Sequence, residues 1–378
     1  MELDDQIVND LRADIPFLQT GIYVDYASVS PLSRRVRAAS ERYDAIISEI
    51  LREAKEMATP IFDSGRSFAA KLVGSSPHNI AYVQNTAHGL SMVALGVDWR
   101  PGDNLVVCAE EFPSNYLCWT QLESMGVELR RVYSSEGSLD TGAISAAMDR
   151  RTRLVTVSHV QFGTGYRVDI PALGSLCSGR GALLIVDGTQ SIGALHLDTA
   201  ANAVDVLVVS AHKWLMGPRG IGFASFSDRA LDQISPRIVG WLSVNDPFAF
   251  NRTLDFLPGA RRFEPGTPNG YGIFGLAERL RQIDGLGIDW IENRILQLNE
   301  ALCEHATCCG VKLRNKFERK ARSGITLLDR DGIAAPELHK KLTAAGIYTS
   351  VRNGAIRVSP HCYNTFDEMK QIISVMAS

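Results

Sequence analysis

The sequence predicts an α/β fold in which a doubly wound, mostly parallel, seven-stranded sheet forms a large domain and a smaller α+β domain follows it. Three observations predict this fold. Short β-branched runs alternate with helical stretches between about residues 79 and 226, as in parallel strands joined by crossover helices. Most of these runs are apolar throughout, as expected for strands covered by helices on both faces. A Gly- and Pro-rich stretch, 258–270, then marks a domain boundary.

The elements follow in order along the chain. The runs predicted as strands of the large sheet are 80–83, 105–108, 127–132, 154–157, 182–186, 204–209 and 221–226, of which 127–132 carries charges and is the most exposed. One long helical stretch runs from 272 to about 306. The smaller unit is predicted from strands 325–328, 348–351 and 355–358 and helices 336–345 and 366–376. We therefore expect a large domain over 20–258 and a small domain over 1–19 and 259–378.

The composition excludes several classes of protein. The chain has 378 residues, of which 45% are hydrophobic and 21% charged, as in soluble globular proteins. Its net charge of −3 gives no electrostatic reason to bind nucleic acid or an acidic membrane. Seven cysteines without a C-x-x-C spacing favour a reducing, cytoplasmic compartment and no metal site. An acidic N-terminus and the lack of an apolar run of about 20 residues indicate neither a secretory signal nor a membrane span.

Lys213 is the first candidate for chemistry, because it directly follows a buried strand and is flanked by bulky apolar residues. Desolvation at such a position lowers the pKa of a lysine and makes its amine nucleophilic. These are the properties that a Schiff-base lysine needs. The alternative is an exposed loop lysine that hydrogen-bonds a helix end.

Two further polar positions follow buried strands. Asp187 ends one of them, where an ionised carboxylate must find a cation or several donors. A protonated pyridine nitrogen would serve, whereas the alternative is an Asp that caps a helix or closes a turn through Gly188. Asn85, Thr86 and Ala87 lie between a strand and a helix, where free backbone amides can bind a phosphate. The alternative there is an ordinary helix N-cap.

These positions belong to a longer pattern. The stretch Asp187-Gly-Thr-Gln190, then Ser210-Ala-His-Lys213-Trp-Leu, then Gly217-Pro-Arg-Gly220-Ile-Gly222, resembles the signature of class V aminotransferase-fold enzymes. That family includes cysteine desulfurases, selenocysteine lyases, kynureninases and isopenicillin-N-epimerase-like proteins. The resemblance extends from Tyr23 to Asn364. It implies a fold-type I enzyme whose cofactor is pyridoxal 5'-phosphate.

The resemblance assigns a role to each polar residue near Lys213. Lys213 would be the catalytic residue, forming the Schiff base and later moving the α-proton. Asp187 would keep the pyridine nitrogen protonated so that the ring accepts electrons. Gln190 would hydrogen-bond the ring hydroxyl oxygen, and Ser210 and His212 would contact the phosphate.

Three further cofactor contacts are implied. Thr86 and the backbone amide of Ala87 would complete the phosphate cradle. Phe112 would stack on the pyridine ring, at the position where desulfurases have a histidine. Thr267, in a loop that reaches the neighbouring subunit in the family, would contact that subunit's phosphate, so a homodimer is implied.

Two arginines would bind the substrate. Arg357 matches the arginine that binds the substrate carboxylate in the family, and Arg352 is a second one nearby; an arginine fork suits a carboxylate. Four residues separate them, and none is a cysteine, whereas desulfurases of the most similar pattern carry a nucleophilic cysteine on a longer loop there. Together with Phe112, this argues against persulfide chemistry. Kynureninases usually have a tyrosine where this chain has His212.

The function implied is that of a pyridoxal phosphate enzyme acting on a small-molecule α-amino acid, through an external aldimine and deprotonation of Cα. Transamination is favoured, because nothing visible marks the sequence for elimination. The alternatives are a lyase that cleaves a Cβ–S or Cβ–C bond and an amino-acid epimerase. The remaining alternative is a non-catalytic protein that binds the cofactor.

Overall fold

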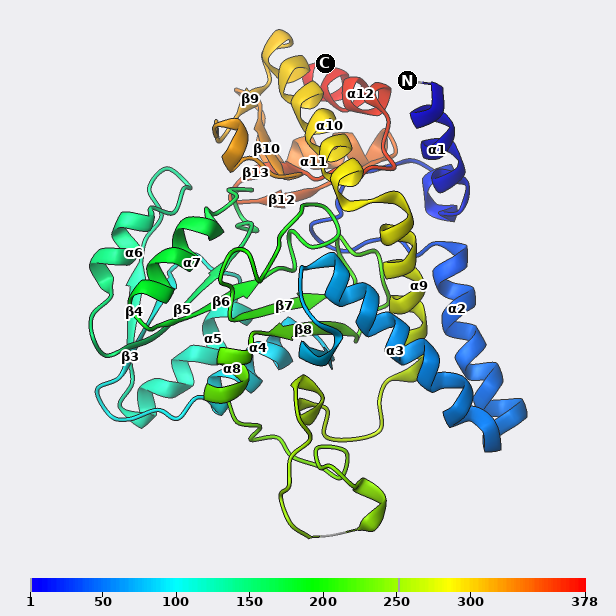
Figure 1. The fold of residues 1–378 in the computed structure, drawn as a ribbon. Helices are drawn as coiled ribbons and strands as arrows, with labels where there is room; N and C mark the ends of the chain where they lie inside the picture. Colours follow the sequence, from blue (N-terminus) through cyan, green and yellow to red (C-terminus); the bar gives the residue numbers. More distant parts are fainter. Residues whose placement is uncertain (1, 251) are drawn as a thin grey trace.

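The computed structural model describes residues 2–250 and 252–378, and its largest element is a mixed sheet with the strand order β2-β8-β7-β6-β5-β3-β4 (Figure 1). The strands are β2 (Ile80–Val83), β3 (Asn104–Cys108), β4 (Glu128–Val132), β5 (Thr152–Ser158), β6 (Leu183–Asp187), β7 (Val206–Ser210) and β8 (Gly222–Phe226). β8 runs antiparallel to both of its neighbours, β2 and β7, and the other neighbouring strands of this sheet are parallel. The predicted doubly wound, mostly parallel sheet is confirmed.

Helices cover both faces of this sheet, because alternate residues of each apolar strand enter two separate cores. In β3, Leu105 and Val107 pack into one core and Val106 into the other. The first core is closed by α4 (Thr86–Gly96), α5 (Ser114–Thr120) and α8 (Asp228–Gln233). The second is closed by α3 (Ala54–Leu72), α6 (Thr141–Ala147), α7 (Ile170–Gly179) and α9 (Gly270–Leu286).

The sequence predicted one long helical stretch from 272 to about 306. The structure has two helices there, so the prediction of a continuous helix was wrong. Helix α9 ends at Leu286 and α10 (Ile288–Cys308) begins two residues later. Gly287 between them has a φ of 81°, a left-handed conformation that glycine adopts without strain and that interrupts a right-handed helix. Helix α9 packs against α2 (Arg34–Ala45) and α3. The predicted boundaries of the large and small domains stay a prediction.

A second, four-stranded antiparallel sheet forms the smaller unit. Its order is β12-β13-β10-β9, made of β12 (Ser350–Arg352), β13 (Ala355–Val358), β10 (Thr326–Asp329) and β9 (Lys312–Leu313). Helices α10, α11 (Ala335–Ala344) and α12 (Phe366–Ala377) share its core. The predicted strand 348–351 is divided, because β11 (Ile347–Tyr348) pairs instead with β1 (Ile22–Tyr23). This pairing joins the N-terminal segment, which begins with α1 (Glu2–Ala13), to the smaller unit.

Short turns connect these elements. The 3₁₀ turns are Pro16–Gln19, Leu51–Glu53, Pro77–Asn79, Gln121–Met125, Pro247–Ala249, Ala260–Phe263 and Arg319–Ala321, and a π turn is Ile46–Ile50.

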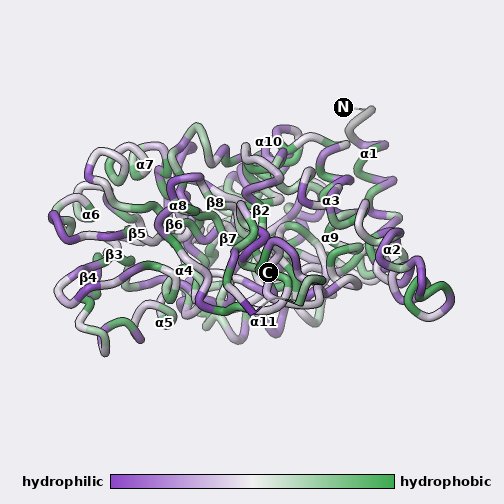
Figure 2. Tube along the Cα trace, turned by 60° about the horizontal axis from the view of Figure 1, so that its bottom comes forward, coloured by the Kyte–Doolittle hydropathy of each residue, from purple (hydrophilic) through white to green (hydrophobic). Residues whose placement is uncertain are grey.

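Figure 2 shows hydrophobic segments concentrated in the central strands and hydrophilic ones along outer loops. In the described residues, no helix combines the length and apolar character needed to cross a membrane.

Candidate active site

One cavity, of about 480 Å³, brings together almost all the predicted site residues. It lies beyond the carboxyl ends of β6 and β7, where doubly wound sheets bind their ligands. The predicted residues that line it are Thr86, Ala87, Phe112, Asp187, Gln190, Ser210, His212, Lys213, Arg352 and Arg357. Thr267 does not line the cavity and is exposed at the surface.

Lys213 lies three residues beyond the end of β7, in a turn that its apolar neighbours bury. Burial lowers the pKa of Lys213 to about 8, partly opposed by the carboxylate of Asp187 and reinforced by the charges of Arg357 and Arg352. Its Nζ lies 5.1 Å from the centroid of the Phe112 ring. At pH 7 roughly a tenth of this amine is then neutral, and the neutral amine is the form that acts as a nucleophile.

Asp187 ends β6 with its side chain in the cavity and only 6% of its surface exposed. Its Oδ1 accepts a hydrogen bond from the backbone amide of Thr189 at 2.9 Å. Burial raises the pKa of Asp187, against the lowering effects of Thr189 and Lys213. A cation placed beside this carboxylate would favour its charged form.

Gln190 is fixed by the protein at both ends of its amide. Its Nε2 donates to the carbonyl of Ala27 at 2.9 Å, and its Oε1 accepts from Trp214 Nε1 at 2.9 Å. A primary amide carries two N–H donors, so one hydrogen of Nε2 remains for a ligand in the cavity. This arrangement suits the predicted contact with a ring hydroxyl oxygen.

Three hydroxyl groups meet at the N-terminus of α4. Thr86 Oγ1 lies 2.5 Å from Thr189 Oγ1 and 2.7 Å from Ser210 Oγ, and the Thr86 amide donates to Ser210 Oγ at 2.9 Å. Burial lowers the pKa of His212 to about 4, so this histidine is neutral at pH 7. The hydroxyls and the positive end of the α4 dipole suit a phosphate.

The far end of the cavity is a wall of the smaller sheet. Pairing of β12 with β13 sets Ser350 opposite Arg357 and Arg352 opposite Ala355, which puts these side chains on one face. The alternate residue Ile356 enters the core of the smaller unit. The hydrophobic alternation of this hairpin therefore points both guanidinium groups into the cavity.

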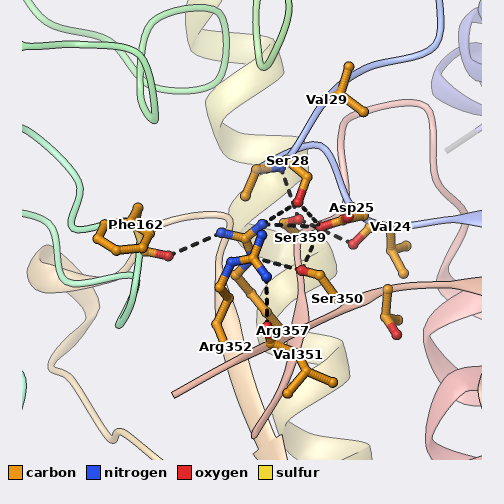
Figure 3. Close-up of polar contacts among 12 residues, drawn as sticks. Val24, Asp25, Ser28, Val29, Phe162, Ser350, Val351, Arg352, Arg357 and Ser359 are labelled. Carbon is orange, nitrogen blue, oxygen red and sulfur yellow. Dashed lines mark hydrogen bonds and ion pairs between the residues drawn. The ribbon is translucent and has the colours of Figure 1, made fainter. Parts of the chain in front are cut away.

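Hydrogen-bond acceptors of neighbouring residues hold the guanidinium group of Arg357 in place (Figure 3). Its Nε donates to Ser350 Oγ at 3.2 Å, and Nη1 donates to the Phe162 carbonyl at 3.2 Å. Its Nη2 donates to Ser28 Oγ at 2.6 Å and pairs with Asp25 Oδ1 at 3.2 Å. Three chain segments, around residues 25–28, 162 and 350, thus meet at this one side chain.

Several residues of the cavity were not predicted from the sequence. Two of them could have been identified from the sequence, because Thr189 lies inside the motif that carried the resemblance and Ser158 ends the buried strand β5. Phe162, whose ring meets that of Phe112 edge-on with centroids 5.2 Å apart, lies in the loop after β5 and belongs to no motif, so nothing in the sequence pointed to it. Buried Glu111 accepts from the Ser158 amide at 2.7 Å, and burial raises its pKa to about 7.

A lysine of lowered pKa beyond a strand end of an α/β sheet, in one cavity with a buried carboxylate, is an arrangement suited to binding a carbonyl cofactor. The aminotransferase class-V family model matches residues 22–372. A probable cysteine desulfurase of Methanothermobacter thermautotrophicus is 31% identical over 96% of this chain and 95% of its own length. One of Pyrococcus abyssi is 29% identical over 98% and 97%. The apo structure of a cysteine desulfurase from Thermococcus onnurineus has a TM-score of 0.89 at 26% identity, covering 98% and 97%.

The chain therefore belongs to the aminotransferase class-V family, whose enzymes use pyridoxal phosphate. The residues present fit this cofactor. Among the described residues, buried Asp187 forms no ion pair, and a pyridinium nitrogen would place a cation directly beside it. The lowered pKa of Lys213 suits attack on an aldehyde. The hydroxyl cluster around Thr86 suits the phosphate.

Proposed function

We propose that the chain is a pyridoxal phosphate-dependent lyase that breaks the Cβ–S bond of a cysteine-type α-amino acid. The observation that carries this proposal is one cavity that joins a lysine of lowered pKa to two guanidinium groups. The names of full-length relatives favour this reading over the transamination that the sequence alone favoured. Both reactions begin with loss of the Cα proton, so the same site residues serve either.

Lys213 and its neighbours account for the proton movements. The cofactor, when bound, supplies a conjugated ring that accepts electrons from bonds broken at Cα. Neutral Lys213 takes the Cα proton on Nζ, in the cavity that the rings of Phe112 and Phe162 also line. The sulfur then leaves with the electron pair of the Cβ–S bond, and protonated Lys213 can return its proton to it.

The sulfur leaves without a cysteine acceptor on this chain. The described residues include all seven cysteines, and none of them lines the cavity. Cys308 and Cys309 are exposed on the smaller unit, and burial raises the pKa of Cys362. We therefore expect the sulfur to be released as sulfide, thiol or persulfide.

Product analysis tests this proposal. The holoenzyme is incubated with L-cysteine, L-cystine and S-methyl-L-cysteine without a keto acid, and pyruvate, alanine and released sulfur are measured. Continuous release of pyruvate and ammonia with an equal amount of sulfide, thiol or persulfide supports this lyase, whereas alanine as the product would mean that the sulfur does not leave with the bonding electron pair. A single conversion of the cofactor to its amine form, without sulfur release, would identify a transaminase instead. The triple variant Cys303→Ser, Cys308→Ser, Cys309→Ser should release sulfur at an unchanged rate.

We also propose that the active form is a homodimer in which Thr267 contacts the cofactor phosphate of the other subunit. Exposed Thr267 follows a loop region with exposed apolar side chains, which supports a covered surface there. These side chains are Ile238, Val239, Trp241, Phe248, Phe250 and Leu254. Thr267→Val should weaken cofactor binding without changing the oligomeric state, and a fully active monomer would contradict the proposal.

A further inference from the structure

Two buried polar side chains, Glu111 and Asn115, stand on either side of Phe112 in the segment that follows β3. Phe112 itself is 39% exposed, so packing in a core does not fix its ring. Asn115 Oδ1 accepts a hydrogen bond from Thr156 Oγ1 of β5 at 2.6 Å. Glu111 reaches the end of the same strand, where it accepts from Ser158. The segment that carries Phe112 is therefore tied to β5 at two points.

The carboxylate of Glu111 accepts three hydrogen bonds from the end of β5 and the loop after it. Its Oε1 accepts from the Ser158 amide at 2.7 Å and from Gln161 Nε2 at 2.8 Å. Its Oε2 accepts from Ser158 Oγ. Ser158 lines the cavity, and Gln161 directly precedes Phe162, which lines it as well. One side chain thus connects the two segments that bring aromatic rings to the cavity.

The positions of these two rings depend on each other. β3 and β5 are neighbours in the sheet, so the segments that follow them begin side by side. Phe112 and Phe162 meet edge-on with their centroids 5.2 Å apart, and Lys213 Nζ lies 5.1 Å from the centroid of Phe112. A shift of either segment would break the edge contact and move Phe112 away from the position in which stacking on the cofactor is predicted.

Stability alone does not account for a carboxylate at this place. Glu111 is 6% exposed, and in the described part of the chain no cationic side chain pairs with it. Burial of an unpaired carboxylate is costly, and burial and the nearby Asp187 both raise the pKa of Glu111. An apolar side chain of similar size would avoid this cost but would not accept hydrogen bonds from Ser158 and Gln161. A carboxylate suits a role in which the positions of these two residues matter.

We infer that Glu111 is a positioning residue that holds the ring of Phe112 in place against the cofactor, directly and through Phe162. Glu111 does not line the cavity, so it acts through the segments after β3 and β5. This role holds for any reaction of the bound cofactor and so goes beyond the proposed function. From the family it takes only the stacking of Phe112, which Phe112→Ala tests by itself.

Two properties of the holoenzyme test this role. They are the apparent dissociation constant of pyridoxal phosphate and the circular dichroism of its absorption band, which depends on how the ring is held. Glu111→Ala removes all three hydrogen bonds, so it should weaken cofactor binding about 10-fold to 30-fold and reduce the dichroic band. Glu111→Gln keeps an oxygen for the two N–H donors and an amide group that can donate to the Ser158 hydroxyl, so binding should stay within about threefold of wild type. Glu110→Ala is the matched control, because this exposed neighbour accepts instead from the Ser134 amide, and it should change neither property.

A double-mutant cycle shows whether the effect passes through the ring. Phe112→Ala alone should weaken cofactor binding about 10-fold. Once Phe112→Ala is present, adding Glu111→Ala should weaken binding by less than about twofold, because the ring that Glu111 holds is gone. The full loss in both backgrounds would overturn the inference. So would wild-type affinity in Phe112→Ala, or a loss in Glu111→Gln as large as that in Glu111→Ala.

Gln161→Met provides a milder test if Glu111→Ala does not fold. It removes only the Nε2 donor next to Phe162, so it should weaken cofactor binding about threefold and reduce the dichroic band. An unchanged band and affinity in Gln161→Met would count against the role of Glu111. Absence of sulfur release by the wild-type enzyme would contradict the proposed function separately, since neither property depends on turnover.

Discussion

The two ends of the cavity, which we propose to be a cofactor end and a substrate end, are built in different ways. At the cofactor end, Asp187 and Ser210 end neighbouring strands, and Lys213 follows Ser210 by three residues. At the substrate end, Arg352 and Arg357 of the smaller sheet meet Ser28 near the N-terminus and Phe162 of the large unit. The residues of the cofactor end lie close together in short sequence motifs. Those of the substrate end are far apart in the sequence and come together only in the tertiary fold.

The two ends also differ in their response to protons. Lys213, Asp187 and His212 at the cofactor end all have shifted pKa values because they are buried. The substrate end relies on guanidinium groups, which stay charged throughout the physiological range. Chemistry and recognition are therefore separable by mutation and by pH.

The largest effect should come from Lys213→Ala. Without the amine, the cofactor has no covalent anchor and the Cα proton has no base, so turnover should fall on the order of 10³-fold or more. Borohydride reduction followed by mass spectrometry should find no cofactor linked to the chain. Lys370→Ala, at an exposed position of α12, is the control. A reducible link that persists in Lys213→Ala would mean that another lysine is the attachment site.

The second largest effect should come from Asp187→Asn, with a loss of turnover on the order of 100-fold. The amide preserves the shape of the side chain but no longer stabilises a cation on the ring nitrogen. Dissociation constants for L-alanine should change little, because the substrate end is untouched. Equal losses in turnover and substrate binding would show that the two ends are not separable.

The effect of pH on the rate of cofactor uptake should be smaller than the effects of these two substitutions. Only neutral Lys213 attacks the aldehyde, and its pKa lies at about 8. The rate at which cofactor-free protein binds pyridoxal phosphate should therefore rise about tenfold per pH unit up to about pH 8 and then level off. Stopped-flow absorbance measures this rate. A rise that continues to about pH 10 would indicate a lysine of ordinary pKa.

The smallest effect should come from Asn353→Ala at the turn of the β12–β13 hairpin. Alanine disfavours the φ of 50° and removes the hydrogen bond to Gly163. We expect the dissociation constant for L-alanine to rise about threefold to tenfold, with cofactor binding unchanged. Asn353→Gly keeps the turn and loses only the hydrogen bond, so its effect should be smaller. A change in cofactor binding would show that the hairpin serves both ends.

The sequence was most informative where function and local structure coincide. Each strand of the large sheet was predicted to within two residues at either end, because buried parallel strands are continuous apolar runs. Lys213 and Asp187 stood at the ends of such runs. The break at Gly287 was missed, since one glycine within a helical pattern does not reveal its φ angle. The pairing of Arg357 with Asp25 joins positions 332 residues apart, which no local pattern encodes.

The two-residue turn between Arg352 and Arg357 makes this wall of the cavity open to redesign. Asn353 and Gly354 are exposed, and the ladder between β12 and β13 ends beside them. Lengthening a surface loop costs only about 0.6 kcal/mol for each doubling of its length. A grafted loop that carries a nucleophilic cysteine could therefore be inserted here without rebuilding either sheet, and the same scaffold would gain an acceptor for the sulfur of the proposed reaction.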